Sequence, residues 1–345
     1  MRGYRGGVPA TFVKTAPSGE RPDQEAAGLR WLADAERVGG TRIARIVALT
    51  RNRLELEYIA EVAATRDSAR RLGSSLARTH AAGAGWFGCP PDDWPGGDTI
   101  GRSRQPFILD AADAPTTWGR FYADWRIAVF TRRLRDGGLI DAAESRTYDR
   151  LCDRLRGGDF DVPQPGLVEG EVARVHGDLW AGNVLWTGDA IGAVLIDPLA
   201  RGDHAESDLG MLALFGLAHL AEVYAAYDEA SPLADGWRDR LSLHALSPLM
   251  FHALLFGGGY GAQALSVARS YACPASPTSP PARTRAPAPH QGCAAQGSRA
   301  LQRSRTALRH PTRRRCRCRG CPGSPRRQGP LRQLPAGAMR TPTRT

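Results

Sequence analysis

Residues 176–183, from His176 to Asn183, read HGDLWAGN and carry the clearest indication of the fold. An apolar segment at 184–186 follows it, then a turn at 187–189 and a second apolar run at 193–196 that ends in Asp197-Pro198. Two short apolar runs joined through a turn are typical of a β-hairpin. The sequence therefore predicts a polar loop, a hairpin, and a carboxylate at the end of that hairpin.

The spacing between Asp178 and Asn183 matches the D-x-x-x-x-N pattern of kinase catalytic loops, with Asp197 in the place of the metal-binding carboxylate. A carboxylate such as Asp178 can accept the proton of an attacking hydroxyl. The oxygens of Asn183 and Asp197 suit Mg²⁺ and leave the ion net positive toward a triphosphate. Alone, the pattern also fits turn hydrogen bonds around a hairpin. The His-Gly prefix and the Asp-Pro ending together favour the kinase interpretation.

Lys14 is the only lysine among the 46 Lys and Arg residues, and it ends a predicted strand at 10–14. A compact ammonium fits between phosphate oxygens, where the wide guanidinium fork fits poorly. Glu25, on a helix predicted at 23–35, is placed to pair with it, as the strand lysine and helix glutamate pair in kinases. The alternative is a surface lysine without a role.

The remaining pattern predicts a small sheet with one helix, followed by helices. Segments 43–49 and 54–59 indicate two more strands, and helical spacing begins at Asp67 and recurs from Trp118 to Leu134. The threonines before Trp118 can cap that second helix. We expect its tryptophan-rich stripe to lie in the core.

The charge is unevenly distributed along the chain. The formal net charge is +11, but residues 273–345 hold 16 arginines and no acidic residue. Removing these 16 from the 46 basic residues leaves 30 against 35 acidic ones, so residues 1–272 carry a net charge of −5. The Pro- and Arg-rich tail has no periodic apolar pattern and is predicted to be disordered. One hypothesis is that it is an out-of-frame read-through product; the functional alternative is a basic nucleic-acid-binding arm.

The cysteine content and the hydropathy of the chain indicate the cellular compartment of the protein. Cys89 and Cys152, outside the tail, are typical of a reduced cytosolic protein, and C-x-C-x-x-C at 316–321 lacks the paired spacing of a zinc module. The longest apolar stretch, 209–223, is too short and too polar for a membrane span, and no signal peptide is evident. We expect a cytoplasmic protein with no membrane partner.

These motifs resemble the fructosamine, or ketoamine, kinases, which are related to the aminoglycoside phosphotransferases and choline kinases. Trp180 within HGDLW-x-GN and the following Ile-Asp-Pro at 196–198 are the most specific marks. GDHAESDLGMLALFG at 202–216 and LFGGGYGAQAL at 255–265 resemble later segments of the family. FVKT around Lys14 and LELEYI near Glu57 also align, so the resemblance covers about residues 11–272.

The resemblance implies an α+β, bilobal protein-kinase-like fold. Its domains would be a nucleotide-binding N-terminal lobe at 1–61, with a small antiparallel sheet and a helix, a larger helical lobe at 62–272, and the tail at 273–345. The implied site residues are Asp178 as base, Asn183 and Asp197 as Mg²⁺ ligands, Lys14 and Glu25 on the ATP phosphates, and Glu57, Tyr58 and Ile59 as the adenine hinge. Five further residues are assigned to either substrate or structural roles: His176, Trp180, His204, Glu206 and Asp208, the last as a candidate acceptor beneath the catalytic loop.

The activity implied is ATP-dependent phosphorylation of a sugar hydroxyl on a ketoamine or glycated amine, by a monomer. The alternatives are an aminoglycoside- or choline-type kinase, or a catalytically impaired kinase-like remnant. The family carries a glycine-bearing hairpin before its strand lysine, whereas only residues 1–13 precede Lys14. We therefore expect a truncated N-terminal lobe and reduced activity.

Overall fold

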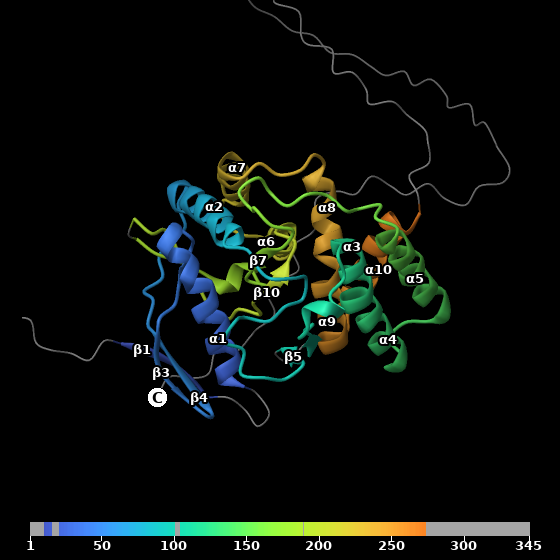
Figure 1. Ribbon diagram of the computed structural model, residues 1–345, viewed down its shortest axis with the longest axis horizontal. Coiled ribbons are helices and arrows are strands. Elements are labelled where there is room, and N and C mark those ends of the chain that lie inside the picture. The colour runs from blue at the N-terminus through green and yellow to red at the C-terminus, as the bar shows by residue number, and fades with distance from the viewer. Residues whose placement is uncertain (1–9, 16–20, 101–103, 189, 274–345) are drawn as a thin grey trace, which may run out of the picture. The chain divides into compact units, whose positions relative to one another are not determined.

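The structure is a computed structural model that describes residues 10–15, 21–100, 104–188 and 190–273 (Figure 1). These residues lie in one compact unit, Met1–Pro274. The tail that we predict to be disordered, residues 273–345, lies outside the described residues except for Cys273. Most of the segment that precedes Lys14, on which the expected truncation rests, lies outside them too.

The first part of the unit is an antiparallel sheet with the strand order β1-β4-β3. Its strands are β1 Thr11–Thr15, β3 Ile46–Thr50 and β4 Arg53–Glu57. Helix α1, Pro22–Ala33, packs its buried Leu29 and Leu32 into the same hydrophobic cluster as Leu54 and Leu56 of β4. The predicted strand around Lys14 and the predicted helix around Glu25 are thus present, and they lie together as the spacing indicated.

The single strand predicted at 43–49 is wrong, because this stretch forms two strands in two sheets. β2, Arg42–Ile43, pairs in parallel with β9, Ala193–Leu195, whereas β3 pairs with β4. The chain changes sheet at Arg45, whose guanidinium pairs with Glu36 at 2.5 Å and whose backbone N–H donates to Glu57. Because β9 also pairs with β8, Val184–Trp186, strand β2 joins the predicted hairpin to the N-terminal part.

Helices form most of the rest of the unit (Figure 1). Helix α2, Arg66–Ala81, begins at a capping box between Thr65 and Ser68 and packs against α7, Leu220–Ala230. Besides α3 and α4, described below, the helices of this part are α5 Ala142–Arg156, α6 Glu206–Leu214, α8 Trp237–His244, α9 Leu246–Phe256 and α10 Gly259–Ala272. Two further strand pairs are β7 Ala173–Val175 with β10 Arg201–Asp203, and β5 Thr99–Ile100 with β6 Gln105–Pro106.

The helix predicted from Trp118 to Leu134 is interrupted. It consists of α3, Trp118–Tyr122, a π-helical turn, Ala123–Ile127, and α4, Ala128–Asp136. Thr117 caps its start, as predicted, by accepting a hydrogen bond from the backbone N–H of Arg120. The wider π turn shifts the side chains that follow it around the helix axis. Trp118, before the turn, lies in the core as expected, whereas Trp125, within the turn, is only half-buried.

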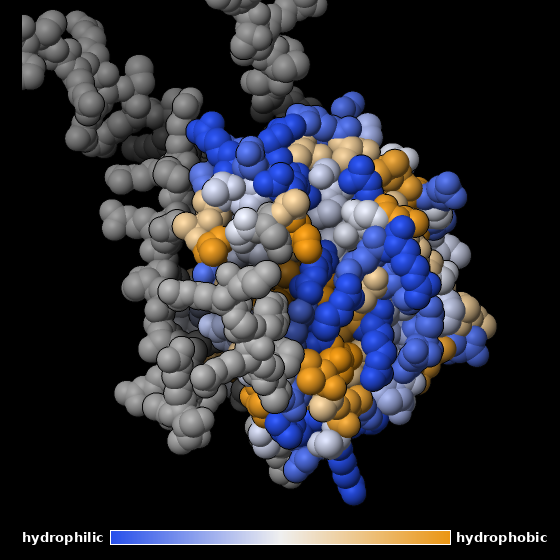
Figure 2. Space-filling view, turned by 90° about the vertical axis from the view of Figure 1, so that its left-hand side faces the viewer, coloured by the Kyte–Doolittle hydropathy of each residue, from blue (hydrophilic) through white to orange (hydrophobic). Residues whose placement is uncertain are grey.

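The outer surface on the sheet side is mainly hydrophilic. Figure 2 shows separate hydrophobic patches among hydrophilic residues on the part of this face that is not grey. Phe12, Val47 and Tyr58 are about half exposed, at 47%, 55% and 54%. No helix within the described ranges is long and apolar enough to span a membrane.

Candidate active site

Lys14, Glu25 and Asp197 come together from three separate elements. The Lys14 Nζ donates to Glu25 Oε1 at 2.8 Å, and it also pairs with Asp197 Oδ1. Strand β1 positions the lysine, α1 positions the glutamate, and Asp197 follows β9 directly. Asp197 has a left-handed backbone (φ +56°), a conformation that aspartate adopts more readily than most residues. This backbone ends the hairpin and turns the carboxylate toward the sheet lysine.

Asp178 and Asn183 lie on the predicted loop and face each other. The Asn183 Nδ2 donates to the backbone oxygen of Asp178 at 2.7 Å and to its carboxylate Oδ2 at 3.2 Å. Burial raises the pKa of the Asp178 carboxyl to about 6, although the Asn183 hydrogen bond and Arg201 oppose that rise. Asp178 therefore has the pKa of a group that can take up a proton near neutral pH.

The backbone of this loop is held from below by Asp208 on α6. The Asp208 Oδ2 accepts from the backbone N–H of His176 at 2.7 Å, and its Oδ1 accepts from that of Gly177 at 2.9 Å. His80 Nε2 pairs with Oδ2 at 3.1 Å, and His80 Nδ1 with the Tyr227 hydroxyl at 2.7 Å. Burial alone would raise the pKa of Asp208, but the hydrogen bonds from His80 and the loop lower it. Asp208 is therefore placed as the structural acceptor that the sequence suggested.

His176 orients the same loop through its ring. Its Nε2 lies 2.9 Å from the backbone oxygen of Ile196, and its Nδ1 accepts from the Asp178 N–H at 3.3 Å. Burial lowers the pKa of His176, which favours the neutral ring that this pattern of one donor and one acceptor needs. The ring therefore links the loop to the end of β9, and His176 is buried.

Arg201 is a member of the site that sequence reasoning missed. Its Nη1 donates to the backbone oxygens of Gly177 and Leu199, both at 3.2 Å, and its Nε donates to Asp203 at 3.0 Å. Gly177 has a φ of +80°, and a Cβ there would collide with the Leu199 carbonyl oxygen. No sequence signal separates this arginine from the chain's others, apart from its position four residues after Asp197.

The predicted hinge residues lie at the end of β4. The Glu57 carboxylate accepts from Arg42 and from the Arg45 N–H, both at 2.8 Å. Burial would raise the pKa of Glu57, but these hydrogen bonds lower it. The backbone N–H of Tyr58 donates to the oxygen of Ala10 at 3.0 Å, and Ile59 packs against the larger core cluster. The side chain of Glu57 is therefore used for structure.

His204 and Glu206 are fully buried beside α8. Arg240 binds the Glu206 carboxylate at 2.6 and 2.9 Å, and His244 Nε2 lies 3.2 Å from it. Burial would raise the pKa of Glu206, but His244 and Arg240 lower it to about 2. The donor atoms of His204, Glu206 and His244 lie within 4.8 Å of one another, but the bidentate arginine already occupies this carboxylate. The structure thus places Glu206 in an internal ion pair with Arg240 and His244, and His204 beside it as a buried ring whose Nδ1 accepts from the Glu206 N–H at 3.2 Å.

Trp180 lies at the rim of the loop and is half-buried. Its ring meets that of Phe215 edge to face, with the centroids 5.8 Å apart. The six-membered part of the indole lies across Gly182, where a Cβ would collide with it. The tryptophan therefore forms part of the site wall and lies outside the two large core clusters.

The donor chemistry of the site fits a nucleotide with Mg²⁺. The Asn183 amide N–H₂ faces Asp178, which directs its oxygen the other way, and the Asp197 carboxylate is the second hard oxygen donor. Lys14 supplies the adjacent positive charge for phosphate oxygens. Mg²⁺ sites of nucleotide enzymes use one or two oxygen ligands from the protein, and phosphates and water complete the coordination shell.

Comparisons with known proteins agree with this geometry. A family model described as "Fructosamine kinase" matches residues 4–272. A probable ketoamine kinase of Synechocystis sp. is 33% identical over 250 residues, which are 70% of this chain and 75% of that protein. The chloroplastic protein-ribulosamine 3-kinase of Oryza sativa subsp. indica is 29% identical over 223 residues, covering 63% of this chain and 58% of that protein. The crystal structure of a protein assigned as a fructosamine-3-kinase from Thermobifida fusca YX-ER1 is 38% identical, with a TM-score of 0.64, over 76% of this chain and 85% of that one.

Proposed function

Because the chain belongs to the fructosamine kinase family, and is therefore a kinase with a protein-kinase-like fold, we propose that it phosphorylates a sugar hydroxyl of a ketoamine. The co-substrate implied by the family is ATP. The observation that carries the proposal is the meeting of Asp178, Asn183, Asp197 and Lys14, from a loop, a hairpin end and a strand, in one connected set of contacts. The family, fructosamine kinase, and the relative named protein-ribulosamine 3-kinase support a fructose- or ribulose-derived acceptor.

Each residue of this set has a distinct role in the proposal. Asp178 accepts the proton of the attacking sugar hydroxyl. Asn183 and Asp197 hold Mg²⁺, which supplies charge stabilisation for the transferred phosphoryl group. Lys14, oriented by Glu25, contacts the phosphate oxygens. Asp208, His80 and Arg201 act indirectly, because they hold the backbone that carries Asp178.

The test is an ATP-consumption assay with acceptors offered in parallel. We expect turnover with N-fructosyl and N-ribulosyl amines, and a phosphorylated ketoamine that mass spectrometry identifies. Kanamycin and choline serve as competing acceptors. They are substrates of an aminoglycoside-type and a choline-type kinase, the two alternative activities that the sequence left open. Preferential turnover of either one would overturn the substrate class, and ATP consumption without a phosphorylated ketoamine would overturn the reaction.

The pH dependence of the reaction follows from the raised pKa of Asp178. A base must be deprotonated to act, so activity is lost as the pH falls through its pKa of about 6. We expect kcat/KM to be half-maximal near that pH and to fall about tenfold per unit below it. An aspartate with an ordinary pKa of 3.8 would leave the rate flat down to pH 5. Circular dichroism at each pH checks that the protein stays folded, and a flat profile in folded protein would contradict the assignment.

A further inference from the structure

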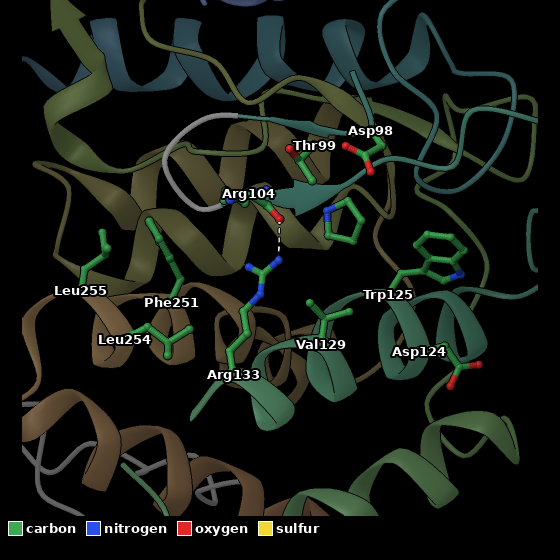
Figure 3. Close-up of a pocket in the computed structure, with 11 residues that line it drawn as sticks. Asp98, Thr99, Arg104, Asp124, Trp125, Val129, Arg133, Phe251, Leu254 and Leu255 are labelled. Carbon is green, nitrogen blue, oxygen red and sulfur yellow. Dashed lines mark hydrogen bonds between the residues drawn. The ribbon is translucent and has the colours of Figure 1, made fainter. Parts of the chain in front are cut away.

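Two cavities among the described residues differ in their relation to the candidate active site. The larger, of about 820 Å³, lies between the β5–β6 pair and helices α4 and α9 (Figure 3), and none of the residues that line it belongs to that site. The smaller, of about 410 Å³, is lined among others by Trp31 and Arg174. Trp31 lies on α1, which carries Glu25, and Arg174 lies on β7, which leads into the catalytic loop. The smaller cavity therefore borders two elements that carry residues of the site.

Arg174 connects these two elements through its guanidinium group. Its Nη1 donates to the backbone oxygen of Trp31 at 2.6 Å, and its Nε donates to that of Gly83, just beyond α2, at 3.1 Å. Its Cζ lies 4.3 Å from the centroid of the Trp31 ring, which is a cation–π arrangement. The guanidinium fork allows all three contacts at once, whereas the ammonium of a lysine could keep only part of them. Arg174 thus joins β7 to the last turn of α1 and to the end of α2.

The surroundings of Arg174 strengthen these contacts. Burial lowers the pKa of Arg174, although the carboxylates of Asp92 and Asp34 oppose this shift. Hydrogen bonds from a cation are stronger than those between neutral groups, above all where little water competes for the donor. The Trp31 side chain is 3% exposed and belongs to the larger core cluster, so packing also holds this end of the connection. Arg174 therefore binds to a fixed point on α1.

Helix α1 carries this connection to the strand lysine. Glu25 lies six residues before Trp31, which is about 9 Å along the helix axis. Its carboxylate accepts from the Lys14 Nζ at 2.8 Å. Because the two residues share one continuous helix, a displacement of Trp31 also displaces Glu25.

Between these two positions, α1 lies directly against the segment that follows β9. A Cβ at Gly28 would lie 3.2 Å from Pro198 Cγ and 3.4 Å from Ala200 Cβ, so the helix backbone and this segment are in close contact there. This contact limits movement at the middle of the helix and leaves tilting about Gly28 as the easier motion. If the Trp31 end were released, such a tilt would move Glu25 in the opposite direction.

We propose that Arg174 is a positioning residue of the phosphoryl-transfer site. By holding the end of α1 against β7, it keeps Glu25 in contact with Lys14 and fixes this pair relative to the loop that carries Asp178. Arg174 acts through Glu25 and does not itself contact the nucleotide or the acceptor. This role rests on the proposed kinase function, in which Lys14 and Glu25 serve the ATP phosphates.

The test is Arg174→Met, which keeps an unbranched side chain and removes the charge and both hydrogen bonds. Because Arg174 borders a cavity, methionine has room there. We expect KM for ATP to rise about fivefold and kcat to fall about fivefold, which is the size of effect that a lost charge-assisted hydrogen bond can produce. KM for an N-fructosyl amine should stay within about twofold, since Lys14 and Glu25 face the nucleotide and not the acceptor. Arg174→Lys, which keeps the charge, should give values between those of the parent and Arg174→Met.

Arg154 provides a matched control whose contacts do not include the site. From α5 it donates to the backbone oxygens of Tyr271 and Cys273, at 2.6 and 2.9 Å, and its Cζ lies 4.8 Å from the centroid of the Phe160 ring. It therefore makes the same kinds of contact as Arg174. Arg154→Met should lower the melting temperature by a similar amount and leave KM for ATP unchanged.

A double-mutant cycle with Glu25→Gln separates positioning from a general structural role. If Arg174 acts through Glu25, Arg174→Met should change nucleotide affinity by less than about twofold once Glu25→Gln is present. Fluorescence titration with a non-hydrolysable ATP analogue measures this affinity without turnover. Effects of the two substitutions that simply multiply would overturn the inference, and so would equal losses of affinity in Arg174→Met and Arg154→Met.

The outcomes distinguish this inference from the proposed function. Unchanged nucleotide affinity and kinetics in folded Arg174→Met would overturn the inference alone, while ketoamine phosphorylation by the parent would stand. A selective loss of affinity in Arg174→Met, from a parent that phosphorylates no ketoamine, would retain the positioning role and overturn the proposed acceptor. A parent that binds no nucleotide would overturn both. If Arg174→Met does not fold, Arg174→Lys and Arg154→Lys enter the same comparisons, and the same outcomes decide.

Discussion

Replacing Asp178 with asparagine is expected to lower kcat about a thousandfold, within the range that a positioned general base supplies. The amide has nearly the same shape but cannot take up the proton of the sugar hydroxyl. Asp178 has no predicted contact with the phosphates, so nucleotide affinity should change by less than about threefold. Stopped-flow or coupled ATP assays give kcat, and fluorescence titration with a non-hydrolysable ATP analogue gives the affinity.

The interpretation needs a control for fold, because Asn183 donates to the replaced carboxylate at 3.2 Å. An unchanged melting temperature would show that the loop keeps its position. Asp113→Asn, at an exposed aspartate outside the site, should leave kcat unaltered. Turnover by Asp178→Asn within about tenfold of the parent would exclude this residue as the base.

The second large effect is expected on stability, from Asp208→Asn. Its two carboxylate oxygens accept from His176, Gly177 and His80; Asp208, His176 and His80 are buried, and Gly177 is half-buried. An amide turns one acceptor into a donor, so at least one buried N–H loses its partner. Leaving buried donors unpaired in this way should lower the free energy of unfolding by about 3 kcal/mol.

Urea denaturation measures this loss directly. Asp149→Asn, at an exposed aspartate on α5, should change the free energy of unfolding by less than about 0.5 kcal/mol. Asp208→Asn should also lower kcat, because the loop it holds carries Asp178. A loss below about 1 kcal/mol would mean that water or another side chain can replace the carboxylate, and that Asp208 does not fix the loop.

The hairpin and the strand around Lys14 could be predicted because their patterns are local. Residues 184–186 and 193–195 form antiparallel strands where the apolar runs indicated them. The pairing of Lys14 with Glu25 followed from a strand and a helix that are adjacent in sequence. In both cases the determining spacing lies within about 15 residues, where periodicity and turn signals are informative.

The features that could not be predicted from the sequence are those set by contacts with residues far away along the chain. Arg45 lies between β2 and β3 and is held by Glu36 and Glu57, and the mostly apolar segment from 43 to 49 does not show that its two halves pair with different strands. The π turn before α4 contacts α5 and α9, which are distant in sequence, and the helical spacing from Trp118 to Leu134 does not show it. Arg201 reaches the loop from a neighbouring strand, and one arginine among many carries no mark of that contact.

The packing of Trp180 across Gly182 has a consequence for how this loop can vary between homologues. Any side chain at position 182 would occupy the volume of the indole, so we expect a lone exchange of this glycine to be disfavoured. A smaller residue at 180 would lift that restriction. The two positions are thus epistatic: in a mutational library they should change as a pair, and the glycine should be lost only in backgrounds that have first given up the tryptophan.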